Sequence, residues 1–164
     1  MRGIVADVSR GADGALAITY VIEGAIGRVC VPQPSAPRIA ERLWQHTCCE
    51  AFVKLHDCGR YHEFNFSPSR EWAAYAFERY REGALLGDAA LDPHVSVRTT
   101  AEALTLQAVI RLPLLSNAYG DAELALALSV VVEERGGDLS YWALRHPAGK
   151  PDFHHPEAFA LELG

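Results

Sequence analysis

Hydrophobic and polar positions alternate along much of the chain. Four segments repeat with a period of two residues: 16–22, 104–112, 124–132 and 159–163. Successive side chains of a β-strand point to opposite faces, so such alternation places one face of a strand on a core. The pattern therefore predicts several strands that each bury one side.

Turn-forming residues separate these strand-like segments. They lie at residues 11–14, 57–60, 67–69 and 135–138. Glycine and proline supply the backbone conformations that tight connections need, and Gly136 with Gly137 between two alternating runs predicts a hairpin. Many short strands punctuated in this way are typical of a sandwich or a barrel.

Helical periodicity is scarce. One short helix is expected at residues 37–45, with Pro37 in its first turn, and another at 78–86, interrupted by Gly83. The sequence has no internal repeat, low-complexity tract or interdomain linker. A length of 164 residues then indicates one domain that spans residues 1–164.

The formal net charge of −6 narrows the range of partners. Nucleic acid and anionic membranes attract a positive field, so we expect the chain to bind neither. Residues 1–8 include Asp7 and no long apolar run, which argues against a signal peptide. No segment approaches the roughly 18 apolar residues of a membrane span. We therefore expect a cytoplasmic protein.

Four cysteines are present: Cys30, Cys48, Cys49 and Cys58. None forms a C-x-x-C pair, and neighbouring residues of a strand point to opposite faces, so Cys48 and Cys49 are poorly placed to share a ligand. In a reducing compartment they are expected to be buried, reduced thiols rather than metal or redox groups.

The middle of the chain resembles a known superfamily. Residues 61–72 read Tyr-x-Glu-Phe-x-Phe-Ser-Pro-x-x-x-Trp, and residues 43–53 precede them as a strand with an acid among aliphatic residues. This is similar to the paired-strand core of DOMON-like proteins and family 9 carbohydrate-binding modules, and residues 139–155 fit a bacterial subgroup of them. The resemblance implies an all-β antiparallel sandwich of about ten strands that binds sugars or, in some branches, haem.

Aromatic and polar residues form the candidate ligand site. A sugar ring stacks one apolar face on an indole and offers its hydroxyls to carboxylates and amides, a combination that the resemblance implies for this chain. The candidate ligand-binding residues are Trp44, Glu50, Glu63, Asn65, Trp72, Trp142 and His146. The alternative is that the tryptophans fill the core and the two glutamates lie at edges or in salt bridges.

The alternation of residues 61–66 separates two faces. Glu63 and Asn65 share one face with Tyr61, whereas Phe64 and Phe66 share the other with His62. The phenylalanine face is the expected core, which turns Glu63 and Asn65 toward solvent or a groove. A buried, hydrogen-bonded Glu63 fits the sequence equally well.

Haem and metal sites were weighed as alternatives. Haem-binding relatives pair an axial methionine with histidine or lysine, and Met1 is the only methionine, so no cofactor is expected. A bis-histidine site stays open among the seven histidines: His46, His56, His62, His94, His146, His154 and His155. A metal-dependent enzyme would use His46, Glu50, His146, His154 and His155. The alternative is that these histidines anchor loops and turns.

The prediction from sequence is a non-catalytic binding module. Its expected ligand is a small molecule, a carbohydrate or sugar-derived metabolite, and the enzyme motifs for serine hydrolysis, nucleotide binding and dinucleotide binding are missing. The cytoplasmic expectation favours a soluble sugar over a polymer. The main alternative is an interaction or assembly domain without its own ligand, such as a homodimer paired along a sheet edge.

Overall fold

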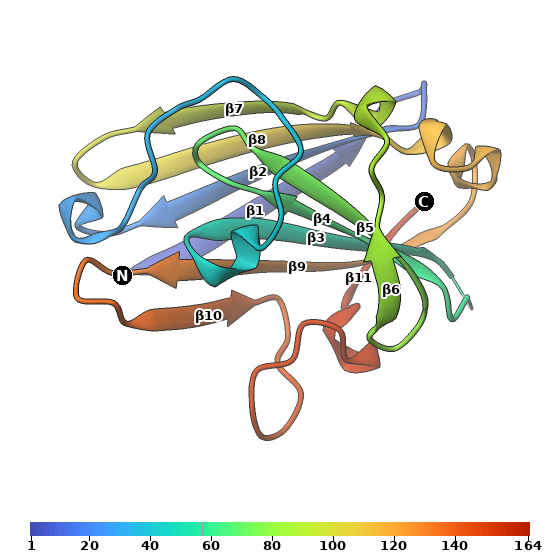
Figure 1. The fold of residues 1–164 in the computed structure, drawn as a ribbon. Helices are drawn as coiled ribbons and strands as arrows, with labels where there is room; N and C mark the ends of the chain where they lie inside the picture. The colour runs from blue at the N-terminus through green and yellow to red at the C-terminus, as the bar shows by residue number, and fades with distance from the viewer. Residues whose placement is uncertain (57) are drawn as a thin grey trace.

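The computed structural model describes residues 1–56 and 58–164, which form eleven strands in two antiparallel sheets. One sheet has the order β1–β2–β8–β7, and these strands are β1 Gly3–Arg10, β2 Ala15–Glu23, β8 Ala103–Arg111 and β7 His94–Thr99. In Figure 1 this sheet lies over the second one, so the chain forms a sandwich. The predicted antiparallel β-sandwich is confirmed.

The second sheet has seven strands. Its order is β10–β9–β3–β4–β5–β6, and β11 also pairs with β9. These strands are β10 Leu139–Ala143, β9 Leu124–Glu133, β3 Cys48–Leu55, β4 Tyr61–Phe66, β5 Trp72–Arg79, β6 Glu82–Leu85 and β11 Leu161–Leu163. Strand β3 lies between β9 and β4 at the middle of this sheet (Figure 1).

The alternating segments became strands as predicted. In β2, Leu16, Ile18, Tyr20 and Ile22 are buried while the residues that alternate with them are partly open, and β8 repeats the pattern. These side chains meet those of Phe64 and Leu126, from the other sheet, in one hydrophobic core. The Tyr20 hydroxyl adds a polar link between the sheets, because it donates a 2.8 Å hydrogen bond to the carbonyl oxygen of Glu50.

The predicted turns join consecutive strands. Gly137 has a φ of 89° in the connection between β9 and β10, a conformation that glycine adopts without strain. Residues 67–71 join β4 to β5, and residues 11–14 join β1 to β2. At the turn predicted for residues 57–60, Asp57 lies outside the described residues.

The prediction of short α-helices was wrong. The helical turns of the described residues are 3₁₀ turns of three residues each: η1 Ile26–Arg28, η2 Leu43–Gln45, η3 Ala89–Leu91, η4 Leu112–Leu114, η5 Asn117–Tyr119 and η6 Pro156–Ala158. Within 37–45 only η2 is helical, because Ile39 bridges to Trp72 and Arg42 takes the left-handed conformation.

Residues 78–86 form the end of β5, a turn and β6. The glycine that interrupts the helical pattern explains this outcome, since Gly83 pairs with Phe77 across the hairpin. A Cβ atom at Gly83 would lie 2.4 Å from the carbonyl oxygen of Ala76 and 2.6 Å from the Phe77 ring. This close approach requires glycine.

Two further expectations concern membranes and cysteines. Over the described residues, no helix has the length and hydrophobicity needed to cross a membrane. The four cysteines are free thiols, as expected, but only Cys48 and Cys49 are buried, whereas Cys30 and Cys58 are half-buried.

Candidate functional site

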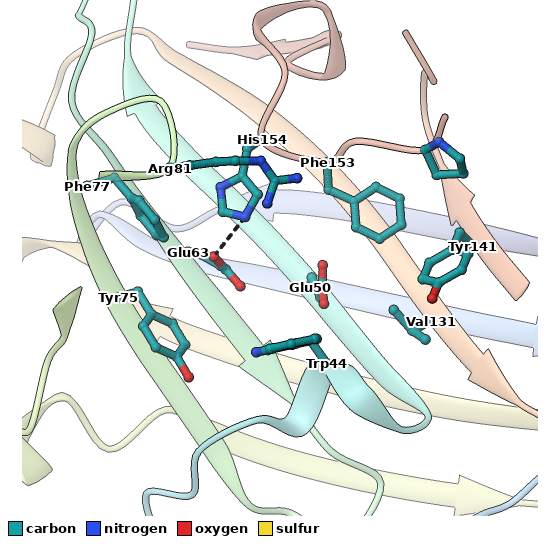
Figure 2. A pocket seen from close by; sticks show the side chains of 11 residues that line it. Trp44, Glu50, Glu63, Tyr75, Phe77, Arg81, Val131, Tyr141, Phe153 and His154 are labelled. Carbon is teal, nitrogen blue, oxygen red and sulfur yellow. Dashed lines mark ion pairs between the residues drawn. The ribbon is translucent and has the colours of Figure 1, made fainter. Parts of the chain in front are cut away.

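A pocket lies on the outer face of the seven-stranded sheet, opposite the core. It encloses about 380 Å³. Aromatic rings surround two carboxylates that project from the sheet (Figure 2). The lining residues are Trp44, Glu50, Glu63, Tyr75, Phe77, Arg81, Val131, Tyr141, Pro151, Phe153 and His154.

Strands β3 and β4 form the floor of the pocket. Glu50 on β3 lies opposite Asn65 on β4, and Glu63 lies two residues before Asn65, so both glutamates project from the same face. The alternate residues Phe64 and Phe66 fill the core. The predicted division of this strand into an aromatic core face and a polar outer face is therefore confirmed.

Trp44 forms one wall and comes from the 3₁₀ turn η2. Arg42, two residues before it, has a φ of 61°, which is unfavourable for a residue other than glycine. His46, just after the turn, lies 2.8 Å from Glu133 at the end of β9. These features hold η2 against the sheet while 47% of Trp44 stays exposed, so its indole is available to a ligand.

The opposite wall is formed by the β5–β6 turn and the loop before η6. The Arg81 guanidinium pairs with Asp152 at 2.8 Å, and Tyr80 donates a hydrogen bond to the same carboxylate. Phe77, at the end of β5, lies edge-on to His154 with ring centres 5.0 Å apart. Arg81 itself has a φ of 57°, so the backbone is held in an uncommon conformation at this wall as well.

His154 faces the pocket between Tyr61 and Glu63. Its Nδ1 lies 2.9 Å from the Tyr61 hydroxyl, which also accepts a hydrogen bond from the backbone N–H of Arg81. Its Nε2 lies 3.7 Å from Glu63 Oε2. Burial and the nearby Arg81 charge lower the pKa of His154 to about 4, so this contact joins a neutral imidazole to Glu63 at neutral pH.

Both floor carboxylates resist ionisation. Glu50 and Glu63 are only 3% and 5% exposed. Burial first, and the charge of Glu63 second, raise the pKa of Glu50 to about 8, although the Ser129 hydroxyl donates to it at 3.1 Å. Burial also raises the pKa of Glu63 to about 7, against the opposing effects of Asn65 and Arg81. The pair thus holds protons at a pH where ordinary glutamates hold none.

Asn65 adds a buried amide to this floor. It is fully buried, and its side-chain N–H donates to Glu63 Oε1 at 2.9 Å. Among the residues that the structure describes, its own Oδ1 has no hydrogen-bond partner, which is unusual for a buried polar atom. The described residues therefore leave the polar floor incompletely satisfied.

The structure brings only part of the predicted ligand set together. Trp44, Glu50 and Glu63 line the pocket, and Asn65 does not line it but donates a hydrogen bond to Glu63. Their roles as ligand contacts stay predictions.

The other three predicted residues lie elsewhere. Trp72 is 2% exposed in the core, on the opposite face of β5. Trp142 packs against that core as well and donates to Ser140 at 3.0 Å. His146 is exposed, with its ring 6.0 Å from that of Phe153, and does not line the pocket. The expectation that all three tryptophans share one recess is corrected, because strand alternation turns two of them inward.

Some missed residues left a signal in the sequence. A turn centred on Ser69 pairs Phe66 with Trp72 and therefore sets Tyr75 opposite Glu63, which is the register observed. The β9–β10 hairpin likewise pairs Trp142 with the core residue Val130 and turns Tyr141 to the pocket side. Phe153 lies in an irregular loop, where no periodic signal exists.

The residues proposed for a metal site do not gather. His46 contacts Glu133, His154 contacts Tyr61, and His155 caps η6 by accepting the Glu157 backbone N–H. In the part of the chain that the structure describes, no three histidine, cysteine, aspartate or glutamate side chains are placed to hold a metal ion.

Comparisons with known proteins support the fold. The sequence matches no protein-family model and no curated protein. A candidate carbohydrate-binding protein from Bacteroides uniformis is 13% identical, with a TM-score of 0.60 over 94% of this chain and 74% of that one. A family 9 carbohydrate-binding module from Caldicellulosiruptor kristjanssonii, in complex with glucose, is 12% identical, with a TM-score of 0.50 over 91% and 71%. The likeness supports a family 9-like fold, and the relation to DOMON-like proteins stays a prediction.

Proposed function

We propose that the chain is a small-molecule binding module and that the pocket on the outer face of the seven-stranded sheet binds a carbohydrate. The observation that carries this proposal is the pairing of exposed aromatic walls with a carboxylate floor. The apolar face of a pyranose ring stacks on an indole or phenol ring, and its hydroxyls donate to carboxylates. Trp44 and Tyr141 supply such rings, and Glu50 and Glu63 supply such acceptors.

The size of the pocket favours a short ligand. Its volume of about 380 Å³ lies near the lower end of the roughly 300–1,000 Å³ of small-molecule sites. The walls are closed on two sides by η2 and by the loop that carries Phe153 and His154 (Figure 2). We therefore propose a soluble mono- or disaccharide rather than a polymer chain.

The similar solved structures agree with this choice without deciding it. One of them holds glucose, but at 12% identity its site does not transfer to this chain residue by residue. The proposal rests on the chemistry of the pocket described above.

Calorimetric titration with a panel of mono- and disaccharides tests the proposal. Trp44→Ala removes a wall and is expected to weaken sugar binding at least about tenfold, which corresponds to about 1.4 kcal/mol. Trp142→Phe, on the opposite face of the sheet, is the matched control and should leave affinity unchanged. A panel without any binder, or equal affinity in the wild type and Trp44→Ala, would contradict the proposal.

An assembly role is the second candidate. Among the described residues, strand β10 pairs with β9 and lies at an edge of the sheet, and its Leu139 and Tyr141 are exposed, with Leu144 just beyond the strand. Such an edge favours pairing with another chain. Light scattering that shows a monomer up to concentrations of about 100 μM, well above a micromolar dissociation constant, would contradict a homodimer of functional strength.

A further inference from the structure

The pocket has more acidic side chains than basic ones. Among the described residues that line it, Glu50 and Glu63 are acidic, and Arg81 is the one permanent cation. Arg81 already pairs with Asp152 at 2.8 Å, so its charge is largely balanced outside the carboxylate floor. His154 is neutral at neutral pH, because burial and Arg81 lower its pKa to about 4.

No cation of the described residues lies at ion-pair distance from Glu50. Among the described residues, the one hydrogen bond to its side chain is from Ser129, a neutral hydroxyl. Glu63 has the neutral imidazole of His154 at 3.7 Å and the amide of Asn65 at 2.9 Å. A buried carboxylate without a positive partner is costly, and a cation that entered the pocket would relieve that cost.

The aromatic walls favour the same kind of ligand. Trp44, Tyr75, Phe77, Tyr141 and Phe153 surround the two carboxylates (Figure 2). The face of an aromatic ring attracts a cation, and rings around a carboxylate are a recurrent way to bind ammonium groups. The walls therefore suit both the ring of a sugar and a positive substituent on it.

We propose that the pocket selects an amino sugar, a sugar whose primary ammonium group lies between Glu50 and Glu63 while its ring stacks on the aromatic walls. This inference rests on the proposed carbohydrate function and names the class of sugar. It predicts preference for a positive substituent over a hydroxyl, an acetamido group or a carboxylate.

A sugar acid is the opposing possibility. Arg81 would have to bind its carboxylate, but Arg81 is occupied by Asp152. The negative charge of a sugar acid gains nothing from Glu50 and Glu63, which repel it whenever they ionise, so the pocket disfavours such a ligand.

Calorimetry at pH 6.5 with matched sugars tests the inference. Glucosamine and galactosamine are each compared with the parent hexose, the N-acetyl derivative and the corresponding uronic acid. We expect an amino sugar to bind at least about tenfold more tightly than its parent hexose. Equal or tighter binding of a hexose, an N-acetyl sugar or a uronic acid would overturn the amino-sugar inference and leave the carbohydrate function standing.

Two further outcomes separate the inference from the proposed function. If none of these sugars binds, both proposals fail. Tetramethylammonium provides the cation without sugar hydroxyls, and binding of this ion as tight as that of glucosamine would overturn the assignment of an amino sugar.

Charge-neutral variants of the two glutamates test whether they cause the preference for an amino sugar. Glu50→Gln and Glu63→Gln keep the acceptors for Ser129 and Asn65 but remove the charge, so each should reduce the preference for the amino sugar over its parent hexose about tenfold or more. Glu23→Gln, at the exposed end of β2 in the four-stranded sheet, is the control and should keep the preference. Retention of the preference in both pocket variants would overturn the inference.

Proton release gives an independent readout. The titratable groups beside the pair include Cys48 on β3, Tyr61 on β4, Tyr75 on β5, Arg81 and His154. Burial keeps the first three protonated by raising their pKa values, whereas Arg81 stays charged and His154 stays neutral. Glu50 and Glu63 are therefore the groups that give up protons when an ammonium arrives.

We expect about one proton to be released per bound amino sugar at pH 6.5, measured in buffers of different ionisation enthalpy. Affinity should increase about tenfold per pH unit between pH 5.5 and 6.5, where the sugar keeps its ammonium charge. Binding without proton release and without this pH dependence would contradict contact between the ammonium and the carboxylate pair.

Discussion

The outer faces of the two sheets differ in how they meet solvent. In β2 and β8 of the four-stranded sheet, buried and partly open residues alternate, so that sheet has one covered face and one open face. In β3 and β9 of the seven-stranded sheet, residues are buried almost without interruption. Because side chains alternate between faces, continuous burial means that both faces of this sheet are covered.

The cover on the outer face of the seven-stranded sheet is what makes a binding site possible. The opposing sheet covers the inner face, whereas η2 and residues 151–159 partly cover the outer one. Polar residues on the open outer face of the small sheet remain hydrated. On the large sheet, Glu50, Glu63 and Asn65 are removed from water without enough partners inside the chain. The same strand alternation thus gives a plain surface on one sheet and a polar pocket on the other.

The largest expected effect separates Trp72 on β5 from Trp44 on η2. Trp72→Ala removes a core side chain that is 2% exposed and should lower the free energy of unfolding by about 3–5 kcal/mol. Trp44→Ala removes a side chain that is 47% exposed and should lower it by less than about 1 kcal/mol. Urea unfolding measures both values.

If Trp72→Ala does not fold, Trp72→Phe should still lower the unfolding midpoint more than Trp44→Phe does. Equal costs at the two positions would contradict the distinction between the sealed inner face and the pocket face.

The pH dependence of stability comes next in size. The raised pKa values of Glu50 and Glu63 mean that the folded chain holds protons that the unfolded chain, with glutamate pKa values near 4.3, has lost. Their contribution to stability is therefore full below about pH 4 and is lost as the pH rises to about 8. The double variant Glu50→Gln/Glu63→Gln should therefore be more stable than the wild type at pH 8 and differ little from it at pH 4.5.

Urea unfolding at a series of pH values checks this difference. The lowered pKa of His154 acts in the opposite direction between pH 4 and 6.5, but His154 is present in both proteins and cancels. A constant difference across the series would show that the two carboxylates ionise normally.

The smallest expected effects come from removing one amide side chain from the outer face of each sheet. Asn65→Ala removes a buried donor to Glu63 and should lower the free energy of unfolding by about 1–3 kcal/mol. Gln107→Ala, at an exposed position of β8, should change it by less than about 0.5 kcal/mol. Similar values from thermal or urea unfolding would mean that the outer face of the large sheet is no more covered than that of the small one.

Most strands were predictable from local pattern, whereas the helices were not. Period two located β2, β8 and β9, and the glycines located the β9–β10 hairpin. Residues 78–86 were misassigned because a short segment with several helix formers does not show its pairing partner. The contact of Gly83 with Phe77 exists only once β5 and β6 lie side by side.

The candidate site was predictable only in part for the same reason. Alternation within β4 correctly placed Glu63 and Asn65 on the face opposite Phe64. It did not tell which tryptophans share that face, since Trp72 and Trp142 lie on other strands whose registers set their direction. Their large apolar surface made them attractive ligand contacts, and the core buries them for that same property.

The sequence alone determined the strands, most of their turns and the polar identity of one face of β4, because each follows from side chains a few positions apart. The tertiary structure decided that this face is covered, that Tyr75, Tyr141 and Phe153 surround it, and that Arg81 in the pocket wall is paired with Asp152. Those properties depend on strand register and on a loop about 90 residues further along the chain than Glu63, and no local pattern encodes contacts at such separation.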